Sequence, residues 1–275
     1  MNIGLSVQQN SFLYLNRLSL SARLRNCPNR YFQITRSAMG LNAGMFTTSL
    51  KSTHFSPTES QDCPTMLNIY HSTGTRGFRV IWVCEELGVP YEINPVDFSA
   101  DYRASPEWRA LNPVGKVPVM TDGDMTMYES CAMMQYVLDQ YGEGRLQPAK
   151  SDANYAHYLQ WCWFAESTFA RPLGEITNHR RAFQPQLDDV VAEMQGRGTA
   201  CVEALDAVFS RQPYLLGDEM CAADLSMAYV MRGYKKNVTE TLPANVQSFF
   251  DRMTALPSFA RTLKADTATA ERLKA

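Results

Sequence analysis

The sequence predicts an α/β domain followed by an all-helical domain, and three observations point to this fold class. From Leu67 onward, short strand-like runs alternate with an amphipathic helical pattern, which is typical of βαβ units. A hairpin signal at Asp122–Gly123 lies within the same stretch. After residue 150 only helical periodicity remains. We therefore divide the chain into a leader at 1–65, an α/β domain at 66–144, a linker at 145–150 and a helical domain at 151–275.

The elements of the α/β stretch follow from local patterns. LNIYHS predicts a strand, and RGFRVIWVCEELG predicts a helix because apolar residues recur on one face and Gly88 supplies a C-cap. VPYEINPVDF predicts a second strand, and a polar, proline-bearing connection runs over 99–113. Two short strands then flank Asp122–Gly123, and a further helix begins at Glu129–Ser130.

The remaining chain predicts helices at 152–179, 186–210, 221–236 and 243–253, with a short tail helix after Pro257. Aromatic residues in the first of these recur every three to four positions, as in a core or dimer-interface stripe. In CAADLSMAYV, Asp224 is expected to accept a main-chain hydrogen bond near Cys221 and so to cap the helix. Cys221 stands where oxygen would be a better acceptor.

Charge is distributed unevenly along the chain. Of 26 basic and 28 acidic residues, six basic and two acidic ones precede Met66, which leaves 20 against 26 and a net charge of −6. Because the folded part is acidic, we expect no nucleic-acid partner. No apolar run approaches the ~20 residues of a membrane span, so we expect no membrane-embedded segment.

The leader is rich in Ser, Thr and Asn and carries no acidic residue before Glu59. This composition is closer to an organellar transit peptide than to a secretory signal, since no continuous apolar segment follows the start. A disordered tail, or translation that begins at Met66, remains an alternative. The expected location is therefore cytoplasmic, or mitochondrial if residues 1–65 act as a transit peptide.

Seven cysteines show neither Cys-x-x-Cys spacing nor an arrangement with histidine that resembles a zinc site. We therefore expect no metal, a reducing compartment, and cysteines that are mostly small buried hydrophobes.

The order and spacing of four segments resemble the glutathione transferases. The segments are VIWVCEELGVPYE, NPVGKVPVM, YESCAMMQYV and YLLGDEMCAADLSMAYV, and the likeness extends from Met66 to about Pro257. It implies a thioredoxin-like βαβαββα domain followed by a helical bundle, with glutathione as co-substrate. It also implies a homodimer, as in most of the family.

Pro118 raises the question of how a strand accepts a proline. A cis X-Pro bond costs only about 0.5–1 kcal/mol, so a cis Val117–Pro118 turn ahead of the strand would leave the Val117 main chain free to pair with an extended peptide. The resemblance assigns Lys116, Val117 and Pro118 to glutathione binding, with the cysteinyl unit at Val117. A trans-proline turn without a ligand is the alternative.

Glu129 and Ser130 stand where a strand gives way to a helix, so Ser130 is expected to cap that helix while free N–H groups face an anion. The resemblance implies that this pair holds the γ-glutamyl group of glutathione. An ordinary N-cap is the alternative.

The segment HSTGTRG precedes the first helix and holds three hydroxyls but no cysteine. A thiol with a pKa of about 8.5 is mostly protonated at neutral pH, so a transferase must favour the thiolate. A hydroxyl that donates to sulfur, together with the positive end of the helix near Gly77, would do so. The absence of cysteine disfavours thiol-disulfide chemistry.

The family's serine-type members place the activating hydroxyl four to five positions before the residue that matches Arg79, which here falls on Gly74 or Thr75. We therefore expect Thr75 to be catalytic, with Ser72 and Thr73 next. A polar loop without a catalytic role is the alternative.

The resemblance implies conjugation of the glutathione thiolate to an electrophilic small molecule, or glutathione-dependent peroxide reduction. Tyr158 and Trp161 are candidates for the pocket of a hydrophobic electrophile. A non-catalytic interaction module and a glutathione-dependent isomerase or dehalogenase remain alternatives.

Overall fold

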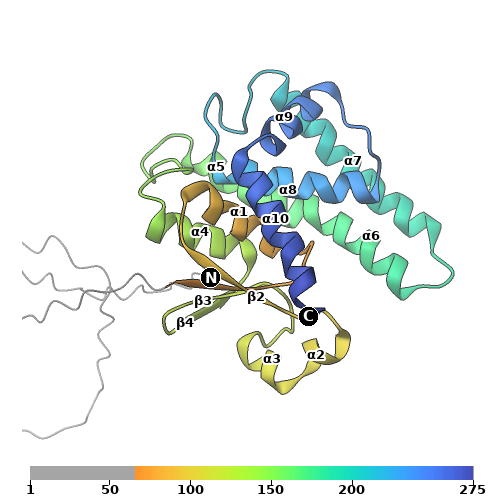
Figure 1. Ribbon diagram of the computed structural model, residues 1–275. Helices are drawn as coiled ribbons and strands as arrows, with labels where there is room; N and C mark the ends of the chain where they lie inside the picture. Colours follow the sequence, from red (N-terminus) through yellow and green to blue (C-terminus); the bar gives the residue numbers. More distant parts are fainter. Residues whose placement is uncertain (1–65, 275) are drawn as a thin grey trace, which may run out of the picture. The chain divides into compact units, whose positions relative to one another are not determined.

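The computed structural model describes residues 66–274, in which a four-stranded mixed sheet precedes a set of helices (Figure 1). The strands are β1 (Leu67–His71), β2 (Tyr91–Pro95), β3 (Val119–Asp122) and β4 (Met125–Tyr128). Their order in the sheet is β2-β1-β3-β4; β1 is parallel to β2 and antiparallel to β3, which is antiparallel to β4. The predicted fold class is confirmed, whereas the expectations for residues 1–65 lie outside the described part.

The helices of this half are α1 (Gly77–Leu87), α2 (Ala100–Ala104), α3 (Pro106–Leu111) and α4 (Ser130–Tyr141). Helices α1 and α4 pack against each other above one face of the sheet, and α2 and α3 lie on its other side (Figure 1). Trp108 of α3 is buried there against Val96 and Val119. The two apolar layers fix the sheet between them.

The segment 99–113, expected to be a polar connection, instead holds the short helices α2 and α3. Helices of five and six residues are too short to show a periodic apolar stripe. Their signal is capping: the side chains of Ser99 and Ser105 accept hydrogen bonds from the amides of Tyr102 and Trp108.

The second half contains α5 (Tyr155–Trp163), a π-helical segment η1 (Phe164–Phe169), α6 (Ala170–Ala182), α7 (Asp188–Phe209), α8 (Ala222–Asn237), α9 (Ala244–Thr254) and α10 (Pro257–Arg272). The helix predicted over 152–179 is therefore interrupted by a π-helical turn, a feature often found near functional sites. The tail helix is much longer than expected. Among residues 66–274, no helix has the length and apolar character needed to cross a membrane.

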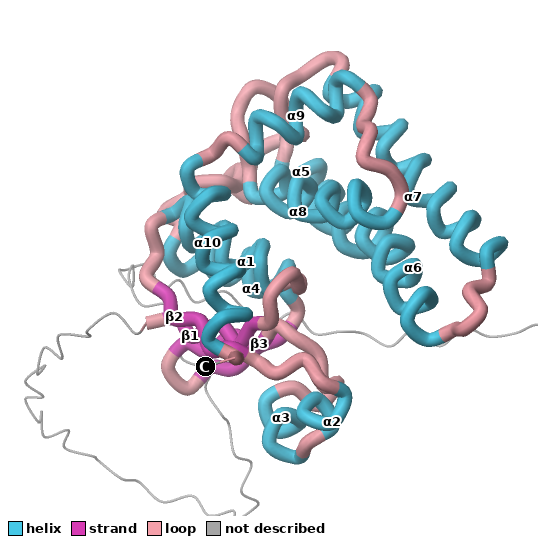
Figure 2. The backbone as a smooth tube through the Cα atoms, turned by 45° about the vertical axis from the view of Figure 1, so that its right-hand side comes forward, coloured by secondary structure: helices cyan, strands magenta, loops and turns pink. Residues whose placement is uncertain are grey.

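Helix α10 returns to the first half of the molecule and lies along α1 (Figure 2). The indole N–H of Trp82 donates to the Ser258 hydroxyl at 3.1 Å. Arg261 of α10 forms an ion pair with Glu85 of α1 at 2.6 Å. Helix α10 is thus anchored beside α1.

The cysteines of the described part behave as expected from their lack of pattern. Cys84, Cys201 and Cys221 are buried, and Cys131 and Cys162 are half-buried. None of these five described cysteines forms a disulfide. Burial raises the pKa of the Cys84 thiol to about 12, which keeps it protonated and unreactive at neutral pH.

The predicted cap of α8 is confirmed. Asp224 accepts the Cys221 amide on Oδ2 at 2.8 Å and the Leu215 amide on Oδ1 at 2.9 Å. The Cys221 thiol also donates to Oδ2 at 3.2 Å. One buried carboxylate therefore joins the start of α8 to the loop before it.

Cys221→Ser is expected to raise the free energy of unfolding by about 0.5–1 kcal/mol, because a hydroxyl caps a helix better than a thiol. Urea unfolding would measure the change. Cys201→Ser is the matched control, since Cys201 is a buried cysteine inside α7 and caps nothing. Equal losses of stability in both variants would contradict this account.

Candidate functional site

Several sequence-predicted site segments meet at one end of the sheet. The register pairs Tyr70 of β1 with Val119 of β3, so continuing it brings Ser72 opposite Val117. Val119 also pairs with Tyr128, and β4 therefore ends at the same place where α4 begins. The 72–75 loop, the Val117–Pro118 turn and the Glu129–Ser130 junction consequently share this end.

The Val117–Pro118 peptide is cis, as expected from the sequence. Among the described residues, none forms a hydrogen bond with the Val117 amide or carbonyl. Pro118 is buried and Lys116 is exposed. The turn thus presents unpaired main-chain groups, which an added strand requires.

Asn112, which the sequence analysis did not single out, builds this turn. Its buried side chain donates to the Lys116 carbonyl at 3.0 Å and accepts the Val114 amide at 3.0 Å. Gly115 has a φ of +65°, and a Cβ there would meet the Arg103 carbonyl oxygen at 2.5 Å. Asn112 and Gly115 therefore hold the chain that leads into Val117.

The junction at Glu129–Ser130 differs in detail from the expectation. Helix α4 begins at Ser130, and Glu129 is the N-cap residue with a φ of 79°. Ser130 is thus the first helical residue and not the cap, because the chain turns at Glu129. Ser130 is 4% exposed, and its hydroxyl has no hydrogen-bond partner among residues 66–274. The hydroxyl lies at the start of α4, where the first main-chain N–H groups have no partner within the helix. Such a group of hydrogen-bond donors is suited to binding a carboxylate.

The three hydroxyls of the 72–75 loop have different partners. Thr73 donates to the main-chain carbonyl of Asp266 in α10 at 2.8 Å. Thr75 donates to the Ser72 carbonyl at 2.6 Å, and its Oγ1 lies 3.3 Å from Nδ1 of His71. The Ser72 hydroxyl has no partner within the described residues. Thr75 lies two residues before α1, whose N-cap is Arg76 and whose first turn carries no acidic residue.

Two residues that the sequence analysis missed support this loop. His71 is fully buried, and its Nε2 lies 2.7 Å from Oδ1 of Asp266. A Cβ on Gly77 would stand 2.3 Å from Nδ1 of the same ring, so Gly77 provides the space for it. No local sequence pattern links His71 to Asp266, because 195 positions separate them.

Two guanidinium groups share one carboxylate beside this loop. Arg76 and Arg79 each approach a different oxygen of Glu166, which lies in η1, at 2.8 Å. Burial lowers the pKa of Arg79, but the neighbouring Cys131 and Glu166 more than offset this and raise it overall. The cluster carries a net positive charge close to the start of α1, which favours an anion there.

The two aromatic candidates differ in how far they are buried. Tyr158 is 1% exposed, its hydroxyl donates to Gln135 at 3.0 Å, and burial raises its pKa. Trp161 packs edge-on against Phe164 at 5.3 Å between ring centroids. Tyr158 is therefore a core residue without surface for a co-substrate, whereas Trp161 is half-buried and stays a candidate.

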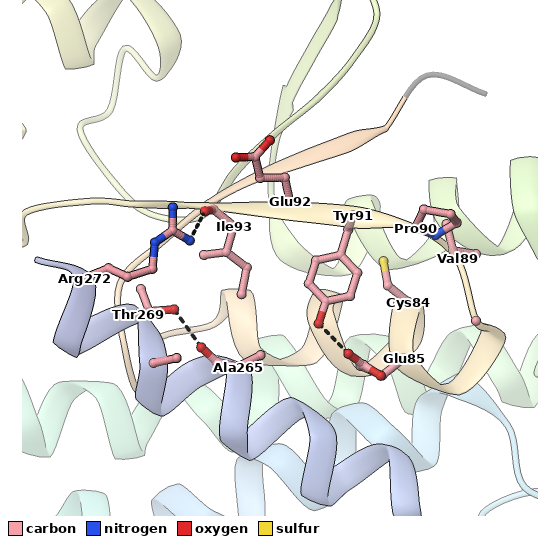
Figure 3. A pocket seen from close by; sticks show the side chains of 12 residues that line it. Cys84, Glu85, Val89, Pro90, Tyr91, Glu92, Ile93, Ala265, Thr269 and Arg272 are labelled. Atoms are coloured by element: carbon pink, nitrogen blue, oxygen red, sulfur yellow. Dashed lines mark hydrogen bonds between the residues drawn. The ribbon is translucent and has the colours of Figure 1, made fainter. Parts of the chain in front are cut away.

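One pocket lies away from this end of the sheet, between α1, the edge strand β2 and α10 (Figure 3). It measures about 620 Å³, and Arg272 closes one end by donating to the Ile93 carbonyl at 2.8 Å. Tyr91 donates to Glu85 at 2.6 Å on its floor. None of the predicted site residues lines it.

Comparison with known proteins agrees with this arrangement. The family model of the glutathione S-transferase N-terminal domain matches residues 66–139. Glutathione S-transferase 4 of Zea mays is 35% identical over 165 residues, which cover 56% of this chain and 70% of that protein. The match combines substantial identity with coverage of most of the relative.

Solved structures show the same fold. The glutathione transferase URE2P8 from Phanerochaete chrysosporium, crystallised with oxidized glutathione, has a TM-score of 0.70 at 24% identity over 76% of this chain and 99% of that one. A glutathione transferase homolog from Sulfitobacter with bound glutathione has a TM-score of 0.65 at 25% identity over 73% and 98%. A thioredoxin-like half joined to a helical half thus defines the class of protein. The chain belongs to the glutathione S-transferase family.

Proposed function

We propose that this protein binds glutathione and transfers its thiolate to an electrophilic small molecule. The observation that carries the proposal is the convergence, at one end of the sheet, of the unpaired Val117 main chain, the unpaired Ser130 hydroxyl and the Thr75 hydroxyl. The solved Sulfitobacter homolog contains bound glutathione, which supports the same ligand here.

Each part of the tripeptide has a counterpart at this end of the sheet. The γ-glutamyl carboxylate is placed at the start of α4 beside Ser130, with its ammonium near the exposed Glu129 carboxylate. The cysteinyl main chain pairs with Val117 as an added strand. Lys116 offers a positive charge at the rim of the turn.

The chemistry assigned to the protein is stabilisation and orientation of the thiolate. Lowering the thiol pKa by about 2 units requires about 2.7 kcal/mol. A hydrogen bond from Thr75, the positive end of α1 and the net charge of the Arg76, Arg79 and Glu166 cluster all act in that direction. No side chain needs to form a covalent intermediate, and peroxides are electrophiles that the same thiolate would attack.

The proposal is tested by calorimetric titration with reduced glutathione and by conjugation of an activated aryl halide. Heat of binding together with product formation is the expected result. Absence of binding at millimolar glutathione would overturn the proposal. Binding without turnover of aryl halides or peroxides would instead favour an interaction module or a specialised isomerase.

Ser130→Ala is expected to weaken glutathione binding at least about tenfold, because a hydrogen bond to a charged group contributes about 1.5–3 kcal/mol. The dissociation constant from calorimetry measures this. Ser210→Ala is the control, since that serine lies at the far end of α7 and bonds only to the Ala207 carbonyl. Equal affinity of the Ser130→Ala variant and the unaltered protein would remove Ser130 from the site.

We also propose a homodimer that uses the outer face of α5. Trp163 is 65% exposed, and Leu159 lies four residues earlier on the same helix face. Large exposed apolar side chains in one place are characteristic of contact surfaces. Sedimentation of Trp163→Glu should show a shift from dimer to monomer, and a monomeric unaltered protein would contradict the proposal.

A further inference from the structure

We propose a proton relay in which the thiol proton of glutathione is transferred by way of the Thr75 hydroxyl, His71 accepts a proton at its end, and Asp266 is the positioning residue that holds the His71 ring. The inference deepens the proposed function and rests on it. It assigns a role to a buried histidine and to a carboxylate on the last helix, neither of which belongs to the glutathione-binding residues named above.

The three groups form a continuous chain of contacts. Oγ1 of Thr75 lies 3.3 Å from Nδ1 of His71, and Nε2 of the same ring lies 2.7 Å from Oδ1 of Asp266. Oδ1 also accepts the Gly74 amide at 2.9 Å. An oxygen in this setting acts as an acceptor, so Nε2 carries the proton and Nδ1 presents its lone pair to Thr75.

The surroundings hold the imidazole in this orientation. His71 is fully buried at the end of β1, and its side chain occupies the space that a Cβ on Gly77 would take. Thr73 binds the Asp266 carbonyl from the same loop, so two loop residues besides His71 contact one residue of α10. If His71 only held the loop to α10, the bond from Nε2 to Asp266 would be sufficient. That role would not require Nδ1 to lie beside the Thr75 hydroxyl.

The charges around the pair are compatible with an imidazolium that forms there. Asp266 supplies the negative charge at Nε2, and Arg232 of α8 also interacts electrostatically with that carboxylate. Because of its interaction with Arg232, Asp266 is not an isolated buried charge.

The proton movements balance as follows. In the protein without ligand, Thr75 donates to the Ser72 carbonyl. When the thiol arrives, the hydroxyl turns and donates to Nδ1 while the S–H group donates to Oγ1. The hydroxyl proton then moves to Nδ1 and the thiol proton moves to Oγ1. The products are a thiolate that accepts from the Thr75 hydroxyl and an imidazolium held between Oγ1 and Asp266. After the sulfur has bonded to the electrophile and the leaving group has departed, the proton returns through Thr75 to solvent.

The relay makes a prediction for the unaltered protein. Because the thiol proton stays on His71, formation of the bound thiolate should release well under half a proton to the buffer. Calorimetry in buffers of different ionisation enthalpy measures proton release, and S-methylglutathione, which has no thiol, corrects for the rest of the ligand. Release of about one proton for each thiolate formed would overturn the relay.

Two variants provide the second test. His71→Gln keeps an amide that can reach Asp266 but has no basic nitrogen, and Asp266→Asn removes the charge that stabilises the imidazolium. We expect each to raise the pKa of the bound thiol by about one unit and to lower kcat about tenfold at neutral pH, with the glutathione dissociation constant changed less than about twofold. The ultraviolet absorbance of the thiolate reports the thiol pKa.

The outcomes separate this inference from the proposed function. If the unaltered protein neither binds nor conjugates glutathione, the proposed function fails. If it does both, and folded His71→Gln and Asp266→Asn variants keep an unchanged thiol pKa and kcat, only the relay fails. If a variant does not fold, the proton-release measurement on the unaltered protein decides.

Discussion

Thr75→Ala is expected to lower kcat at least about tenfold, while the affinity for glutathione changes little. A hydrogen bond to a charged partner contributes about 1.5–3 kcal/mol, and each 1.4 kcal/mol corresponds to about a factor of ten in rate. Thr75 lies two residues before α1, and its hydroxyl contacts only the nearby Ser72 carbonyl and the His71 ring, so its removal should leave the fold intact. Steady-state kinetics with an aryl halide, alongside calorimetric binding, measures both quantities.

Thr75→Ser and Thr73→Ala are matched controls. Thr75→Ser keeps the hydroxyl and should retain most of the activity. Thr73→Ala removes a hydroxyl that donates to the main-chain carbonyl of Asp266 in α10. This variant should therefore lower the free energy of unfolding more than it lowers kcat. Full activity of Thr75→Ala combined with a loss in Ser72→Ala would transfer the catalytic role to Ser72, whose hydroxyl is unpaired among the described residues.

Asp224→Ala is expected to lower the free energy of unfolding by about 3 kcal/mol. The change leaves the buried amides of Leu215 and Cys221 without an acceptor, and each unsatisfied buried group costs about 1–3 kcal/mol. Removal of a buried charge offsets part of that cost. Urea unfolding measures it, and Asp251→Ala is the control because that carboxylate is exposed and bonds only to Gln247. Equal small losses in both variants would contradict the capping role.

Asp224 also predicts how stability depends on pH. Burial raises its pKa from 3.8 to about 6, although its bonds to the Cys221 and Leu215 amides act in the opposite direction. Because the folded chain then binds the proton more tightly than the unfolded chain, this contribution to stability is present below pH 4 and is lost as the pH rises through about 6. The unaltered protein should show this loss between pH 4 and 6, and Asp224→Ala should not.

Local patterns were sufficient for most of the fold. Apolar periodicity and Gly88 defined α1, the hairpin signal at Asp122–Gly123 defined β3 and β4, and Asp224 marked the start of α8. Periodicity failed where elements are short or irregular. Helices α2 and α3 have too few turns for a stripe, and the π-helical η1 keeps a helical composition while it changes the spacing of side chains.

The site was predictable only where its residues lie close together in sequence. The cis turn at Val117–Pro118 and the 72–75 loop follow from proline and hydroxyl chemistry, and the structure places them as expected with respect to the sheet. His71 reads as an ordinary strand residue. The role proposed for His71 depends on its contact with Asp266, which is 195 positions away in the sequence. Tertiary packing determines such a contact, and the periodicity of apolar residues does not predict it.

Asp266 of α10 makes three contacts with the 71–75 loop. The thioredoxin-like half of the molecule therefore lacks these contacts when α10 is absent. During synthesis the 71–75 loop leaves the ribosome well before α10, which contacts it in the folded protein. A nascent chain that does not yet include α10, or a chain cleaved before it, would therefore hold the 71–75 loop without these contacts. Under the proposed function, we expect such a chain to activate the thiol of glutathione less well than a chain that includes α10.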